Sequence, residues 1–270
     1  IELGIVQNSH YYPGSTWGDP DHDGDLDLLV LTSGTGPLGP PPWDNADQFE
    51  AAGPNRMYMN DSGDGFSLED LANHDPEPYS CCAAFVDMNL DFKQDLYIVN
   101  DFGMYIEPNQ VFLNDGEGSL ELHEGSGIDV GMFGMGLAVS AFNDDQYPDF
   151  VATDWGRNWL FLSDGYGQWY DATQQFGFVS QQSDQYVGWG VELPDVDNDG
   201  DLDIWVGYGQ LDLEAEEQEV FDEMGLFNPR HQPDALYIQD EGQLIDVADI
   251  WGINIDTITR GAVWADVNND

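Results

Sequence analysis

The segment "DPDHDGDLD" (residues 19–27) places an acidic side chain at nearly every second position between two apolar stretches. The same pattern returns along the chain, and one copy is interrupted at the last residue. The later copies are "DMNLDFKQD" (87–95), "AFNDDQYPD" (141–149), "DVDNDGDLD" (195–203) and "DVNND" (266–270). A motif that recurs in this way is typical of repeat architectures, so the sequence predicts tandem copies of one structural unit.

Each polar loop lies between two short runs of β-branched and aromatic residues, such as "GWGVELPD" (188–195) before a loop and "LDLLVL" (26–31) after one. Such runs are typical of strands. A second motif follows each loop: "NRMYMNDSGDGF" (55–66), "NQVFLNDGEGSL" (109–120), "NWLFLSDGYGQW" (158–169) and "DALYIQDEGQL" (234–244). Its apolar run, Asn/Asp/Gly turn and second run predict a hairpin. Every unit should therefore contain four strands.

Four-stranded units in tandem predict an all-β fold and favour a β-propeller over a β-sandwich, because sandwiches do not repeat a fixed motif. The expected units are 12–75, 76–129, 130–180 and 181–253, with 1–11 ending a preceding blade and 254–270 starting the next one. We expect about four of seven blades to be present. We also expect the natural sequence to continue with a turn residue and an Asp four places after Asp270, and a targeting segment to lie outside these residues.

Extra residues occur between the second and third strands of the first and fourth units, at 34–54 and 208–233. The first insertion is rich in Gly and Pro and should be irregular. The second, "LDLEAEEQEVFDEMG", predicts a short acidic helix that ends at Gly225. In an up-and-down blade both insertions emerge on the face opposite the polar loops.

In the first loop, oxygen-bearing side chains occupy positions 1, 3, 5 and 9, and Gly occupies position 6. Alternating side chains in a curled loop can point at one centre, while the carbonyl of position 7 adds a further oxygen. Oxygen ligands without His or Cys suit a hard cation, and flexible geometry favours calcium over magnesium. An EF-hand is excluded because position 12 is Val30, Ile98 or Val206, each inside an expected strand.

An acidic turn without metal stays open as an alternative, most of all in the second and third loops. The second has Asn89 at position 3 and Phe92 where Gly is preferred, and the third has Ala141 at position 1. In the first loop, however, several carboxylates repel one another unless a cation is present, since like charges about 4 Å apart cost roughly 1–4 kcal/mol. We therefore expect folding to depend on calcium and a chelator to lower the melting temperature sharply.

Charge and composition narrow the classes of partner. The 270 residues hold 53 Asp and Glu against five Lys and Arg, a net charge of −48, which excludes nucleic-acid binding and argues against an anionic membrane surface. No apolar run reaches the roughly 18 residues that membrane insertion needs. At 41% hydrophobic residues the chain can still bury a core. The acidic surplus fits either a salt-adapted source or an acidic binding face.

Together the strands, loops and hairpin motif resemble the FG-GAP/VCBS repeat of integrin α-subunit propellers and many secreted bacterial proteins. The "NRMYMN" and "NQVFLN" forms are most similar to the cartilage acidic protein and ASPIC/UnbV subgroup. This resemblance implies a seven-bladed propeller and a secreted, extracellular or cell-surface setting. It also implies three to four calcium sites, one of them uncertain because of Ala141.

The residues that the resemblance assigns to calcium fall into five loops. They are Asp19, Asp21, Asp23 and Asp27; Asp87, Asn89, Asp91 and Asp95; Asn143, Asp145 and Asp149; Asp195, Asp197, Asp199 and Asp203; and Asp266, Asn268 and Asp270. Main-chain oxygens would come from Asp25, Lys93 and Asp201.

A scaffold for adhesion is the leading functional hypothesis, with a protein or glycan bound at the insertion face. The candidate anchors are Trp43, Phe49, Phe221 and Phe227, and for each of them core packing is the more common role. The alternatives are a lectin and a polysaccharide lyase or hydrolase. The His residues are scattered, and Arg157 and Arg230 are the basic candidates for an enzyme. Cys81 and Cys82 are adjacent and form either two free thiols or a vicinal disulfide.

Overall fold

A computed structural model of the 270-residue chain shows how these segments fold. It describes residues 12–34, 49, 52–60, 65–71, 77–116, 119–143, 145–179, 186–209, 232–255 and 258–267. The chain forms two compact units. Unit 1 comprises Ile1–Gly134 and Ser163–Tyr170, and unit 2 comprises Met135–Leu162 and Asp171–Asp270.

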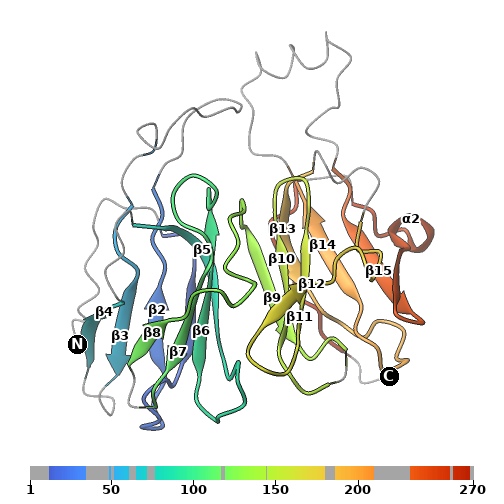
Figure 1. Cartoon of the computed structure of the whole chain (residues 1–270). Coiled ribbons are helices and arrows are strands. Elements are labelled where there is room, and N and C mark those ends of the chain that lie inside the picture. Colours follow the sequence, from blue (N-terminus) through green and yellow to red (C-terminus); the bar gives the residue numbers. More distant parts are fainter. Residues whose placement is uncertain are drawn as a thin grey trace. The chain divides into compact units, whose positions relative to one another are not determined.

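The described part of the chain contains four sheets, each of four antiparallel strands that follow one another in sequence order (Figure 1). The first has β1 (Ser15–Gly18), β2 (Asp27–Val30), β3 (Arg56–Asn60) and β4 (Phe66–Asp70); the second has β5 (Tyr79–Val86), β6 (Asp95–Asp101), β7 (Gln110–Asn114) and β8 (Leu120–Leu122). The third has β9 (Gly136–Ser140), β10 (Asp149–Thr153), β11 (Trp159–Ser163) and β12 (Trp169–Asp171). The fourth has β13 (Gly188–Glu192), β14 (Ile204–Tyr208), β15 (Ala235–Asp240) and β16 (Gln243–Asp246), followed by the short helix α2 (Ala248–Trp251). The predicted all-β fold of four-stranded units is confirmed.

The second strand of each sheet is the most deeply buried. All residues of β10 and β14 are buried, because their apolar side chains are covered on both faces. One apolar core joins the two sheets of unit 1 through Leu29, Leu96 and Phe112, among others. A second core, which includes Val151 and Val206, joins the two sheets of unit 2. Buried second strands hold the polar loops that precede them on a rigid base.

One hydrogen bond recurs wherever a sheet meets the start of the next repeat. The backbone N–H seven residues before a polar loop donates to the carbonyl thirteen residues after the start of the preceding loop. These bonds are Ser80 to Thr32 (3.0 Å), Gly134 to Asn100 (3.1 Å), Gly188 to Asp154 (3.0 Å) and Thr259 to Tyr208 (3.0 Å). The same register four times means that the segment leading into each polar loop meets the preceding sheet through the same backbone bond.

The first residue of each hairpin motif explains why that register is kept. Its side-chain Oδ1 accepts the N–H of the residue that receives the bond from the next repeat. The pairs are Asn55 with Thr32 (2.9 Å), Asn109 with Asn100 (2.9 Å), Asn158 with Asp154 (3.3 Å) and Asp234 with Tyr208 (2.9 Å). The Asn or Asp at this position therefore has a structural role.

The predicted first strand of a fifth unit, before Asp266, is wrong for the described residues 258–267. They contain no strand, although Thr259 makes the repeated bond to Tyr208. A first strand is completed by its bonds to a second strand, and none of the described residues pairs with this segment as a strand. Val263 and Val267 consequently stay exposed.

The predicted insertions lie largely outside the described residues, as do Trp43, Phe221, Phe227, Arg230 and the expected acidic helix. Phe49 is described, and its ring packs against Phe102 at 5.0 Å and stacks on Tyr105 at 5.9 Å between ring centroids. This ring packs internally, which agrees with the expectation that core packing is the more common role for each of these aromatic residues.

The adjacent cysteines lie at an irregularity of β5 and are free thiols. The pairing of β5 with β6 shifts between Ser80 and Cys82, so Cys81 is an extra residue in a bulge. Burial raises the pKa of Cys82 to about 12, which keeps its thiol protonated.

Candidate metal centre

The four complete polar loops share two side-chain-to-backbone hydrogen bonds. The side-chain oxygen of position 3 accepts the N–H of position 5, in Asp21–Asp23 (3.2 Å), Asn89–Asp91 (3.0 Å), Asn143–Asp145 (3.3 Å) and Asp197–Asp199 (3.3 Å). Position 5 accepts the N–H of position 7, in Asp23–Asp25 (2.8 Å), Asp91–Lys93 (3.0 Å), Asp145–Tyr147 (3.0 Å) and Asp199–Asp201 (2.9 Å). These Asx turns curl the loop. The proposed ligand role of the carbonyls of Asp25, Lys93 and Asp201 stays a prediction.

Position 6 takes the left-handed backbone conformation that the sequence predicted from Gly. Gly24 has φ 94° and Gly200 has φ 101°, values that a side chain would strain. Phe92 and Gln146 adopt φ 68° and 73° at the same position without glycine. The second and third loops therefore keep the turn despite their departures from the motif.

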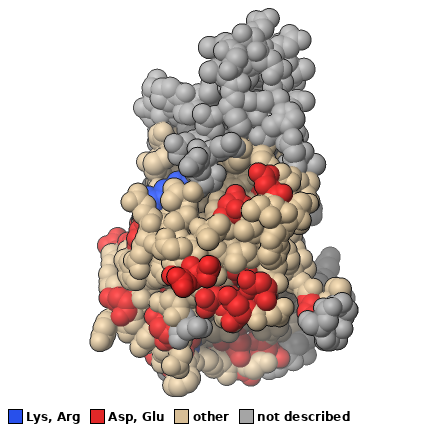
Figure 2. All heavy atoms as spheres, turned by 90° about the vertical axis from the view of Figure 1, so that its right-hand side faces the viewer, with Lys and Arg blue, Asp and Glu red and all other residues tan. Residues whose placement is uncertain are grey.

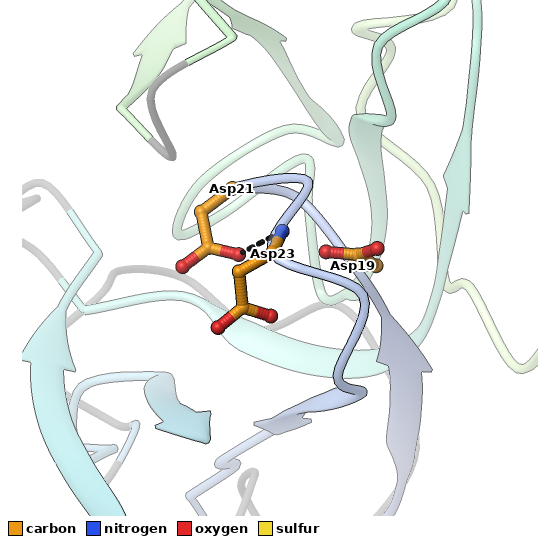
Figure 3. Close-up of side chains that lie close together, drawn as sticks. All are labelled: Asp19, Asp21 and Asp23. Atoms are coloured by element: carbon orange, nitrogen blue, oxygen red, sulfur yellow. Dashed lines mark hydrogen bonds between the residues drawn. The ribbon is translucent and has the colours of Figure 1, made fainter. Parts of the chain in front are cut away.

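Two loops bring three carboxylates together. Oxygens of Asp19, Asp21 and Asp23 lie within 4.8 Å of one another, and so do those of Asp195, Asp197 and Asp203. Figure 3 shows the carboxylates of Asp21 and Asp23 side by side, with the N–H of Asp23 bonded to Asp21. Within the described residues these are the two groups of three close metal-ligating side chains.

The closing aspartate at position 9 is fully buried in every complete loop, as Asp27, Asp95, Asp149 and Asp203. Its first oxygen accepts an N–H from the end of the third strand, from Asn60 to Asp27 (2.7 Å), Asn114 to Asp95 (2.9 Å) and Gln239 to Asp203 (2.9 Å). Its second oxygen accepts the N–H of position 2, from Met88 (2.9 Å), Phe142 (2.8 Å) and Val196 (2.8 Å). The closing aspartate thus fastens the loop to the sheet.

The first loop differs because position 2 is Pro20, which has no N–H to donate. Asp27 Oδ2 is consequently buried without a hydrogen-bond partner. Asp19 Oδ1 in the same loop is also buried and unpartnered. A buried acceptor without a donor costs roughly 1–3 kcal/mol. A bound cation would give these two oxygens the partner that they lack.

The raised pKa values of the closing aspartates also favour a bound cation. Burial, and then the neighbouring carboxylates, raise the pKa of Asp27 to about 6, despite the opposing bond from Asn60. Burial likewise raises the pKa of Asp95 to about 6, and that of Asp203 is raised for the same reason. Burial therefore makes the charged form of these carboxylates costly, and no Lys or Arg among the described residues forms an ion pair with them to offset that cost.

The second loop contains a cation of its own. Lys93 Nζ lies 3.7 Å from Asp91 Oδ2 and donates to the carbonyl of Asp115 at 2.7 Å. The sequence assigned only the main-chain oxygen of Lys93 to the loop and missed its ammonium group. Asp87 accepts the N–H groups of Asp91 (3.0 Å) and Phe92 (2.8 Å), as Asp195 does for Asp199 and Gly200 in the fourth loop.

The third loop has no carboxylate at position 1. Its Asn143 Nδ2 donates to Asp145 Oδ2 at 3.0 Å, so one predicted ligand binds another. In the interrupted fifth loop, Asp266 is described and exposed, whereas Asn268 and Asp270 lie outside the described residues.

From the calcium ligands that the sequence predicts in the second loop, replacing Lys93 with Met is expected to raise the calcium affinity of that loop about fivefold. The change removes a positive charge beside Asp91, and such a pair of charges near the surface interacts by roughly 1 kcal/mol. Titration calorimetry measures the affinity, with Arg56→Met as a control that removes a positive charge from β3. An unchanged or weaker calcium affinity of Lys93→Met would contradict the idea that the Lys93 ammonium competes with calcium for Asp91.

Arg157, the basic candidate for catalysis that the structure describes, is held by two neighbouring side chains. Its guanidinium pairs with Asp171 and lies 4.0 Å over the ring of Trp159. Figure 2 shows several clusters of Asp and Glu on the face of the molecule drawn there. No helix among the described residues is both long enough and apolar enough to span a membrane.

Comparison with known proteins identifies the repeat. Residues 142–206 match the family described as FG-GAP-like repeat. This segment runs from the third polar loop through β13 and the fourth loop into β14, so it covers one period of the repeat and the start of the next. No curated protein matches the sequence. Residues 142–206 therefore carry an FG-GAP-like repeat, and the four-stranded sheets fit the blades of a β-propeller.

Proposed function

We propose that this chain is a calcium-binding β-propeller scaffold. The observation that carries the proposal is the pair of buried, unpartnered oxygens, Asp19 Oδ1 and Asp27 Oδ2, in the loop where Asp19, Asp21 and Asp23 converge. Among the described residues four buried side-chain atoms have no hydrogen-bond partner, and two of them are in this one loop. Calcium would supply positive charge, and both oxygens could coordinate it.

The loops should differ in affinity. The first and fourth combine close carboxylates with Gly at position 6 and are the strongest candidates. The second has Asn89 in place of a carboxylate and the competing Lys93 ammonium, so it should bind more weakly. The third lacks a ligand at Ala141 and should bind least. Oxygen-only ligands favour calcium over transition metals, and the flexible loop favours it over magnesium.

The proposed setting is extracellular, secreted or at the cell surface, where millimolar calcium saturates even weak sites. The match to an FG-GAP-like repeat supports this setting. The proposed role is adhesion or assembly through a protein or glycan bound at the insertions, 34–54 and 208–233. Because Phe49 is packed internally, other insertion residues would make that contact. Of the two basic candidates for the enzyme alternative, Arg157 is paired with Asp171, and Arg230 lies outside the described residues.

Thermal unfolding in excess calcium, excess magnesium and EDTA tests calcium binding. We expect calcium to stabilise the chain by about 3 kcal/mol for each site filled at a hundred times its dissociation constant, and magnesium to do much less. The double variant Asp21→Asn with Asp197→Asn should lose most of this gain.

Asp164→Asn is the matched control. Asp164 also accepts Asx-turn N–H groups, from Tyr166 at 2.7 Å and Gln168 at 3.2 Å, but it lies in a hairpin. This variant should keep the full response to calcium. Equal unfolding temperatures of the natural chain in calcium and EDTA would refute the proposed function.

A further inference from the structure

Side chains of the second repeat connect the first two polar loops. Gln94 Oε1 accepts the backbone N–H of Asp19 at 2.7 Å. Asn114 Nδ2 donates to the carbonyl of Pro20 at 2.7 Å and to that of Gln94 at 2.9 Å. All of these residues belong to unit 1. The start of the first loop, including its first candidate ligand, is therefore fixed to the second repeat.

The same two residues are fixed to the closing aspartate of the second loop. Asn114 donates its backbone N–H to Asp95 Oδ1 at 2.9 Å, and Gln94 directly precedes Asp95 in the chain. Asp95 is fully buried and Asn114 nearly so. A displacement of Asp95 therefore also displaces the two groups that hold Asp19 and Pro20.

The chain leading into the first loop packs tightly against Gln94 and Phe85 of the second repeat. A Cβ atom on Gly18 would lie 2.8 Å from Gln94 Oε1 and 2.5 Å from the ring of Phe85. Glycine is thus required for the chain leading into the first loop to pass this close to the second repeat. The packing makes the hydrogen bond from Asp19 a fixed contact.

Gln94 is a departure from the repeat. It occupies position 8, where the other complete loops have Leu26, Pro148 and Leu202. None of those side chains can form a hydrogen bond. The Gln94 connection is therefore specific to the first pair of loops, and the chain itself offers Leu as a compatible replacement.

We propose that Gln94 and Asn114 are positioning residues that couple calcium binding in the first and second loops. The inference rests on the proposed calcium function. Binding in the second loop would hold Asp95 in one place, and through Gln94 and Asn114 it would hold Asp19 and Pro20 as well. Part of the cost of ordering the first loop is then already met, which raises its affinity. Coupling between two sites is reciprocal, so the first loop strengthens the second by the same factor.

Calorimetric titration of the full chain with calcium measures the coupling. Asp197→Asn with Asp199→Asn first removes binding by the fourth loop, and Asp145→Asn removes binding by the third. In this background Asp91→Asn leaves the first loop alone, and Asp21→Asn leaves the second loop alone. The coupling factor is the overall affinity of the chain with both loops divided by the product of the two single-loop affinities. We expect a factor of about five or more, the usual lower range for coupled sites.

Two variants test whether Gln94 and Asn114 transmit the coupling, and each introduces the residue that another repeat has at the same position. Gln94→Leu introduces the residue of the first and fourth loops, and Asn114→Ser introduces Ser163 of the third repeat. Each should reduce the factor to between one and two while both loops still bind. Gln168→Leu, the same change at an exposed glutamine, should leave it unaltered.

The outcomes separate the two proposals. A factor of one in the chain with natural Gln94 and Asn114, with both loops binding, overturns the coupling and leaves the calcium function intact. A large factor that survives both variants overturns the assignment to Gln94 and Asn114. Failure of both single-loop chains and of the chain with both loops to bind calcium overturns the calcium function and the coupling together.

Discussion

Replacing Asp203 with Ala is expected to destabilise unit 2 by about 3–5 kcal/mol even in EDTA. Asp203 is fully buried and accepts the backbone N–H groups of Val196 at 2.8 Å and Gln239 at 2.9 Å. Alanine leaves both donors buried without partners, and each such loss costs roughly 1–3 kcal/mol. Urea unfolding in EDTA measures this structural part without any contribution from metal.

Asp199→Ala in the same loop separates the structural role from the metal role. Asp199 is exposed and accepts one N–H, from Asp201 at 2.9 Å. In EDTA this variant should lose less than about 1 kcal/mol, because water can replace the carboxylate. In calcium both variants should lose the stabilisation that the fourth loop provides. Equal losses for the two variants in EDTA would contradict the buried role of Asp203.

The pH dependence of stability should change sign with calcium, and Asp27 is the clearest reporter. Its folded-state pKa of about 6 lies above its ordinary value of 3.8. Without metal, protonation therefore stabilises the native state, and this contribution is lost as the pH rises through about 6. Lowering the pH from 7 to 5 in EDTA should add about 1 kcal/mol through Asp27. In calcium the same step should destabilise the chain, because protons compete for the ligand oxygens.

Asp27→Asn tests the same point at fixed pH. The amide oxygen can still accept the N–H of Asn60, while the variant removes a buried charge that lies near Asp19, Asp21 and Asp23. We expect the variant to be more stable than the natural chain in EDTA at pH 7 and less stable in calcium.

Asp95→Asn is the matched control, since Asp95 uses both oxygens to accept N–H groups. It should destabilise the chain in EDTA, because the amide cannot accept both bonds. A stability that changes in the same direction with pH in calcium and in EDTA would contradict the account of Asp27.

The sequence predicted the repeated parts of this fold well because each is determined locally. Asp and Asn at positions 3 and 5 form Asx turns with neighbours two residues away, and these turns are present in all four complete loops. The strands beside them follow from runs of apolar residues, as in β6 and β10. Local chemistry of this kind can be read from one chain.

Contacts between repeats were not predictable in the same way. The loop motif assigned no role to Gln94, and its bond to Asp19 joins residues that are 75 positions apart. The ammonium of Lys93 and the unpartnered oxygen of Asp27 also depend on the packing of several segments. Two signals were nevertheless present in the sequence: proline at position 2 of the first loop, and a hydrogen-bonding residue at position 8 of the second.

The expected first strand before Asp266 shows that local composition can also predict an element that is not formed. Its sequence, "RGAVWAD" (260–266), has the composition of a strand, and Thr259 before it takes the repeated register with Tyr208. A strand also requires a partner on its other side, and the described residues supply none. Composition alone therefore predicted a strand that the structure does not form.

The most direct test of the calcium site is a crystal structure of the full chain grown in millimolar calcium, with anomalous scattering recorded to identify the ion. We predict an anomalous peak enclosed by Asp19, Asp21, Asp23 and Asp27, and a second one in the loop of Asp195 and Asp203. Asp27 Oδ2 and Asp19 Oδ1, the buried oxygens without partners, should both lie against the first ion. Ordered loops without an anomalous peak, with water bonded to those two oxygens, would contradict the account.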